Sequence, residues 1–75
     1  MTTFNLYIDE ESSTAYVVPD GSPRPSEDSV FAYSVEDSPQ ESVARLIRVA
    51  TRDYNVDTFV IPEGISHSLE YLSYP

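Results

Sequence analysis

Apolar and polar residues alternate near the start of the chain, where Phe4, Leu6 and Ile8 are each separated by one other residue. This period of two is typical of a strand with one buried face. A second β-branched and aromatic segment, residues 14–18, follows a polar turn at residues 10–13. We therefore expect the first two segments to pair as a hairpin.

The next stretch, from Pro19 to Ser29, is rich in proline, serine, glycine and acidic residues, and its three prolines each deny the backbone a hydrogen-bond donor. It predicts a loop. Residues 30–35 are again apolar and aromatic and predict a third strand, and residues 57–61 predict a fourth, ended by Pro62.

A helix is predicted between the third and fourth strands. Ser38 at the N-cap, Pro39 at the first helical position and Glu41 three residues after the cap have the sequence of a capping box. Asn55 is expected to end the helix in the left-handed conformation. Residues 66–73 are compatible with a short closing helix and also with a final edge strand. In the helix that begins after Ser38, apolar residues recur at the spacing of a single stripe: Val43, Leu46, Ile47, Ala50 and Tyr54.

The element order β-β-β-α-β predicts an α+β fold. We expect a small two-layer sandwich in which an antiparallel sheet of about four strands is covered by one helix, with the C-terminal tail left open. A chain of 75 residues forms a single domain, residues 1–75, with a thin core.

Charge is the most unusual property of the composition. The chain has thirteen acidic residues, four arginines and no lysine, which gives a formal net charge of −9. Small soluble domains are usually comfortable with a net charge of magnitude about 2–8, so this charge favours a basic partner. Direct nucleic-acid binding is disfavoured, because a nucleic-acid footprint is basic.

The acidic residues predict the partner-binding surface. Carboxylates spaced over a rigid sheet resemble an array of phosphates and can occupy a basic nucleic-acid channel on another protein. Adaptation to a high-salt cytoplasm and plain solubility explain the same composition and remain open. The predicted contact residues are Asp9, Glu10, Glu11, Glu27, Asp28, Glu36 and Asp37.

Tyr7 is the predicted aromatic anchor of that surface. If Phe4, Leu6 and Ile8 face the helix, the opposite face of the first strand carries Asn5, Tyr7 and Asp9. Tyrosine is enriched in protein interfaces, although it is also an ordinary strand residue. Tyr16 and Tyr33 either join Tyr7 there or belong to the core.

The arginines offer an alternative partner-binding surface. Arg45, Arg48 and Arg52 share the helix face opposite the apolar stripe. They form either a guanidinium ridge that grips carboxylate or phosphate, or a solvated helix face on which Glu41 pairs with Arg45. Both interpretations stay open.

No catalytic chemistry is predicted. The chain has one histidine, His67, no cysteine and no glycine-rich phosphate-binding loop, so we expect no enzymatic activity, metal site or cofactor. Neither a signal-peptide pattern nor a run of about 20 apolar residues is present, so a cytoplasmic location without membrane contact is the expectation.

Two segments resemble a known family. Residues 15–20, Ala-Tyr-Val-Val-Pro-Asp, and residues 37–43, Asp-Ser-Pro-Gln-Glu-Ser-Val, are similar to the strand end and the helix start of small antitoxin domains of the HicB kind. The resemblance implies a β-β-β-α-β fold and a toxin-neutralising role. The glycine that precedes the family's helix is missing here, and so is its DNA-binding tail.

As a class, the chain also resembles the small, acidic, single-domain inhibitors made by bacteriophages, anti-CRISPR proteins among them. That resemblance implies occupation of a nucleic-acid surface on a host complex. The sequence therefore predicts a non-enzymatic interaction module, a phage-type inhibitor that binds a basic surface of a larger nucleic-acid-handling protein in the host cytoplasm. An antitoxin-like partner of a small basic toxin and an acidic domain from a salt-adapted organism are the alternatives, and the oligomeric state is open.

Overall fold

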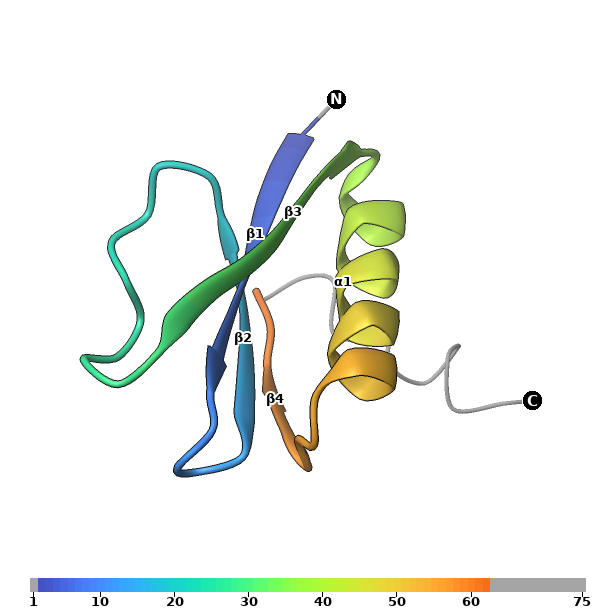
Figure 1. The fold of residues 1–75 in the computed structure, drawn as a ribbon. Helices are drawn as coiled ribbons and strands as arrows, with labels where there is room; N and C mark the ends of the chain where they lie inside the picture. Colours follow the sequence, from blue (N-terminus) through green and yellow to red (C-terminus); the bar gives the residue numbers. More distant parts are fainter. Residues whose placement is uncertain (1, 63–75) are drawn as a thin grey trace.

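The computed structural model describes residues 2–62 and places one helix against a four-stranded sheet (Figure 1). The strand order is β3-β1-β2-β4, which confirms the predicted α+β sandwich and the β-β-β-α-β order. The elements are β1 (Thr2–Asp9), β2 (Thr14–Pro19), β3 (Val30–Asp37), α1 (Pro39–Asp53) and β4 (Thr58–Val60).

The sheet is mixed, whereas the sequence predicted an antiparallel one. β1 runs antiparallel to both β2 and β3, so β2 and β3 share one direction. Because α1 carries the chain back along the sheet, β4 then starts from the same end as β3 and pairs in parallel with β2. β4 has three residues, shorter than the predicted 57–61. The predicted closing element at residues 66–73, with His67, lies outside the described residues.

The core lies between α1 and one face of the sheet. Alternate residues of β1 face the helix, and α1 contributes the predicted apolar stripe, with Leu6 and Leu46 fully buried. Tyr54 and Phe59 pack at the margin of this core. The buried apolar residues in the cluster are Phe4, Leu6, Ile8, Ala15, Val17, Val35, Val43, Leu46, Ile47 and Ala50.

The helix starts as predicted, but without the capping box. Ser38 is the N-cap and Pro39 the first helical residue, yet the Ser38 side chain makes no capping hydrogen bond. In a capping box Glu41 would accept a hydrogen bond from the Ser38 backbone N–H. Here that N–H donates instead to Oδ1 of Asp37 at 2.8 Å, so the adjacent carboxylate displaces Glu41.

The predicted left-handed C-cap at Asn55 is wrong. The helix ends at Asp53, and its C-cap residue Tyr54 has an extended backbone with φ −134° and an N–H that donates to the Ala50 carbonyl. Among the described residues, Ser13 is the one non-glycine residue with positive φ. An extended residue immediately after the helix turns the chain toward β4 without a left-handed step.

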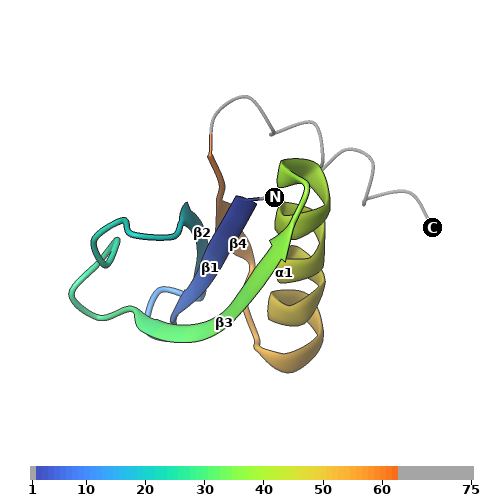
Figure 2. The same ribbon diagram turned by 90° about the horizontal axis from the view of Figure 1, so that it is seen from above.

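The loop at residues 20–29 lies on the side of the sheet opposite α1, as both views show (Figures 1 and 2). One end is tied to β1 by a hydrogen bond from the Asn5 side-chain amide to Asp20 Oδ1, 3.1 Å long. The other end is tied by Ser26 Oγ, which donates to Asp9 Oδ2 at 3.3 Å. The loop thus partly covers the sheet face that the sequence predicted to be open.

A β-bulge in β3 changes which of its side chains share a face. Leu6 pairs with Tyr33, but Tyr7 pairs with Phe31, so Ala32 is an extra residue between them. Directly paired residues project to the same face of a sheet. Tyr33 therefore shares the helix face with Leu6, and Phe31 shares the loop face with Tyr7.

Candidate interaction surface

Acidic residues gather at one end of the sheet, where β1 and β2 are joined and β3 and β4 begin. The β1–β2 turn carries Glu10 and Glu11, the segment before β3 carries Glu27 and Asp28, and Asp57 precedes β4. We call these five exposed residues the acidic end. Backbone N–H groups of Asp57 and Thr58 both donate to the Ser13 carbonyl, at 2.9 and 3.2 Å, and hold the start of β4 against the turn.

Two of the predicted contact residues lie at the other end of the sheet. Glu36 pairs with Thr3 and Asp37 pairs with Thr2 at the start of β1. At about 3.3 Å per residue, the level of Thr3 is roughly 23 Å from the level of Glu10 along the strand. The seven predicted carboxylates therefore do not form one surface.

Asp9 was predicted to be an exposed contact residue, and the structure corrects this. Only 6% of its surface is exposed. Its Oδ1 accepts the backbone N–H groups of Glu11 and Ser12 at 3.1 and 3.3 Å, and its Oδ2 accepts from Ser26 Oγ. A carboxylate placed at the end of a strand stabilises the turn that follows by accepting these otherwise free donors. The Asp9 carboxylate stabilises the backbone of the acidic end, and its charge is not exposed for contact with a partner.

An apolar row crosses the loop face of the sheet beside the acidic end. Phe31 pairs with Tyr7, Tyr7 with Tyr16, and Tyr16 with Val60, so the row spans all four strands. The rings of Tyr7 and Phe31 meet edge to face with centroids 5.9 Å apart. Phe31 is 54% exposed, whereas Tyr7 and Tyr16 are half-buried.

Sequence reasoning missed Phe31 and Asp57. Regular alternation from Val35 places Phe31 on the helix face, and only the bulge at Ala32 moves it to the loop face. Asp57 was assigned to a strand, and its place beside the turn depends on the hydrogen bonds to Ser13. No pattern in the sequence marks either contact.

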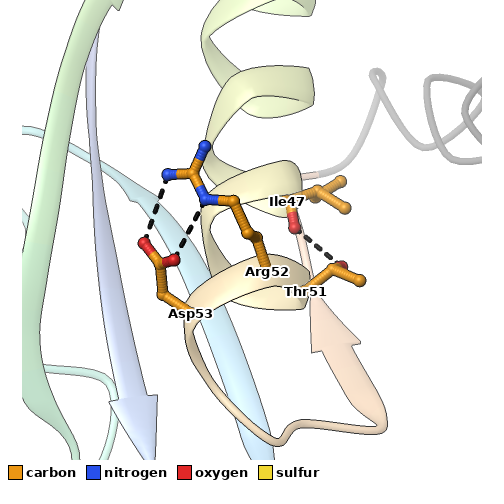
Figure 3. Close-up of polar contacts among 4 residues, drawn as sticks. All are labelled: Ile47, Thr51, Arg52 and Asp53. Atoms are coloured by element: carbon orange, nitrogen blue, oxygen red, sulfur yellow. Dashed lines mark hydrogen bonds and ion pairs between the residues drawn. The ribbon is translucent and has the colours of Figure 1, made fainter.

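The three helix arginines are all exposed, as predicted. Arg45 pairs with Asp37 at 3.8 Å, and this contact takes the place of the predicted pair with Glu41. Arg52 makes two bonds to Asp53, from Nε to Oδ1 at 3.0 Å and from Nη2 to Oδ2 at 3.2 Å (Figure 3). Arg48 makes no ion pair within residues 2–62.

The Arg52–Asp53 contact shifts the pKa values of both side chains. The hydrogen bond from Arg52 lowers the pKa of Asp53, and their charge attraction lowers it further. The same hydrogen bond raises the pKa of Arg52. Next to this pair, Ile47, Arg48, Thr51 and Arg52 line an open depression of about 400 Å³. The Thr51 hydroxyl donates to the Ile47 carbonyl at 2.8 Å, so its proton is engaged within the helix (Figure 3).

Within residues 2–62 no three His, Cys, Asp or Glu side chains are grouped so that they could hold a metal ion. No helix in this part of the chain is long and apolar enough to cross a membrane. No protein-family model, curated protein or solved structure matches the chain.

Proposed function

We propose that this chain is a non-enzymatic interaction module of the phage-inhibitor kind, and that its acidic end occupies a basic nucleic-acid-binding surface on a host complex. The observation that carries the proposal is the gathering of Glu10, Glu11, Glu27, Asp28 and Asp57 at one end of the sheet, in a chain of net charge −9.

The scaffold beneath these carboxylates supports the proposal. The Asp9 carboxylate accepts hydrogen bonds from the β1–β2 turn and from the loop, and the Ser13 carbonyl accepts hydrogen bonds from the start of β4. The backbone segments that carry the acidic residues are therefore held in place by hydrogen bonds. A fixed array of charges binds an oppositely charged surface at a lower cost in ordering than a mobile tail does. Exposed charges steer the encounter, and the partly exposed ring of Phe31 beside Tyr7 supplies apolar contact.

Paired charge-reversal variants test where the partner binds. Glu10→Lys with Glu11→Lys alters the acidic end, and Glu36→Lys with Glu41→Lys makes the same change in net charge at the opposite end. All four residues are exposed, so both variants should fold. Partners recovered from host lysate by the wild-type chain are identified by mass spectrometry. We expect them to be nucleic-acid-binding proteins that the first variant fails to recover and the second retains.

Competition and salt complete this test. Duplex DNA or RNA added to the purified complex should displace the chain, and affinity should fall steeply between about 0.05 and 0.3 M salt, because exposed charges are screened beyond about 8–10 Å. If both charge-reversal variants lost the partner equally, the net charge of the chain would explain binding and the acidic end would not be the contact surface. Loss only in Arg45→Glu with Arg48→Glu would move the binding surface to the helix arginines and overturn the assignment.

A further inference from the structure

β3 forms one edge of the sheet, and no strand among residues 2–62 pairs with its outer side. It is eight residues long, whereas β4 at the opposite edge has three. An edge strand presents a row of unpaired backbone N–H and C=O groups, which is a template for pairing with another chain. A short edge strand such as β4 offers few such groups.

The exposed apolar side chains are concentrated on the same strand. Four large hydrophobic residues of the described chain are notably exposed, and three of them lie on β3: Val30 at 65%, Phe31 at 54% and Tyr33 at 51%. The fourth is Val60 on β4, at 47%. Edge strands are commonly guarded by charged residues, above all lysine, by proline or by a bulge. β3 has no lysine or proline, and its two charged residues, Glu36 and Asp37, lie at its C-terminal end. The bulge at Ala32 interrupts the edge but leaves a regular segment, residues 33–37.

We propose that β3 pairs with β3 of a second copy of this chain, antiparallel and about a two-fold axis, so that the two sheets become one. Paired residues must share a face, and a two-fold axis centred on Ser34 satisfies this. It places Tyr33 opposite Val35 of the second copy, both on the helix face. The two Glu36 side chains then lie about 13 Å apart along the strands, so neither carboxylate faces the other.

Charges beside this edge favour a second copy over an acidic or a basic strand from another protein. The helix covers the β1 and β3 side of the sheet, so its charged residues flank the β3 edge. Asp37 is paired with Arg45 and Arg52 is paired with Asp53, so the balance of charge at each end decides. The end at the helix start carries Asp37, Glu41 and Arg45, one net negative charge. The other end, where Arg52 lies near Tyr33, carries Arg48, Arg52 and Asp53, one net positive charge. A two-fold axis reverses the second helix and brings the Arg52 end of one copy beside the Asp37 end of the other. Oppositely charged ends of the two flanks therefore meet in the dimer, as a two-fold interface requires.

Sedimentation equilibrium from about 1 µM to 1 mM protein tests this pairing. We expect the mass to double from 8.4 kDa as concentration rises. Tyr33→Lys should weaken dimerisation at least about tenfold, because lysine on an edge strand opposes pairing. Val60→Lys is the matched control: it changes a residue of similar exposure on the other edge and should leave the dimer intact. Ser34→Lys, at an exposed position on the two-fold axis, provides a second disrupting variant.

Hydrogen exchange gives an independent readout. Outward-facing backbone amides of residues 33–35, which pair with one another about the axis, should exchange more slowly as protein concentration rises, whereas the amides of β4 should not change. A mass that stays at 8.4 kDa throughout the range overturns the proposal. Equal effects of Tyr33→Lys and Val60→Lys overturn it as well, because the contact would not then be specific to β3.

Dimerisation and binding of a basic partner use different residues. Glu10→Lys with Glu11→Lys should leave the dimer unchanged, and Tyr33→Lys should leave recovery of a basic partner unchanged. The two proposals can therefore fail separately: a chain that does not dimerise can still bind a basic partner, and a chain that binds no basic partner can still dimerise.

Discussion

The two faces of the sheet are covered by different kinds of interaction. On one face, α1 buries side chains such as Leu6 and Leu46 in a continuous apolar core. On the other, the loop at residues 20–29 is held by polar contacts, with Asn5 bonded to Asp20 and Asp9 bonded to Ser26. Asn5 and Asp9 are buried at 8% and 6% exposure, the same values as Val35 and Ile47 in the core.

This difference shows how a small domain can order a surface without enlarging its core. Apolar burial is non-directional and grows with the area removed from water, so it stabilises the helix face broadly. Hydrogen bonds contribute less to stability on average, but they fix particular atoms and are costly to leave unmade when buried. The loop face therefore gains its shape from a few side chains, and that shape positions the acidic end.

The largest effect is expected on the helix face. Leu46 is fully buried, and Leu46→Ala should lower the free energy of unfolding by about 2–5 kcal/mol, because the lost transfer energy is joined by the energy of the cavity. Leu46→Met conserves most of the volume and should lose less than about 1.5 kcal/mol. Urea denaturation monitored by circular dichroism measures both. Similar losses for the two variants would show that the helix face is loosely packed.

A smaller effect is expected on the loop face. Asp9→Ala leaves the N–H groups of Glu11 and Ser12 and the hydroxyl of Ser26 without their acceptor and should lower the free energy of unfolding by about 1–3 kcal/mol. Asp9→Asn keeps one acceptor oxygen and should lose less. The matched control is Glu10→Ala, an exposed change expected to stay within about 0.5 kcal/mol.

Urea denaturation also measures this series. A stability loss in Asp9→Ala no larger than that in Glu10→Ala would remove the contrast between the two faces, because it would mean that the buried carboxylate does not hold the loop.

The smallest effect concerns the exposed end of the helix, away from both faces. Because Arg52 lowers the pKa of Asp53 in the folded chain, this pair stabilises the fold above the ordinary aspartate pKa of 3.8. That contribution disappears as pH falls through the lowered pKa of the folded state. Titration of the Asp53 carboxyl carbon by NMR should give a value below 3.8. Arg52→Gln should return it to the ordinary range, and no change in that variant would contradict the assignment.

Sequence periodicity determined the elements that depend on near neighbours. Alternation in β1 and the apolar stripe of α1 predicted which faces are buried, because each pattern repeats over residues that lie within a few positions of one another. Pro39 and Ser38 located the helix start for the same reason. Composition alone determined the excess of negative charge. The exposed helix arginines also followed from the helical period.

Tertiary structure decided the features that depend on pairing between distant segments. The bulge at Ala32 turned Phe31 to the loop face, and the return of the chain through α1 made β4 parallel to β2. The loop buried Asp9 through Ser26, seventeen residues away. Asp57 joined the acidic end through the Ser13 carbonyl. Local preferences encode neither register nor loop contacts, since both are set by which distant backbone groups meet when the chain closes.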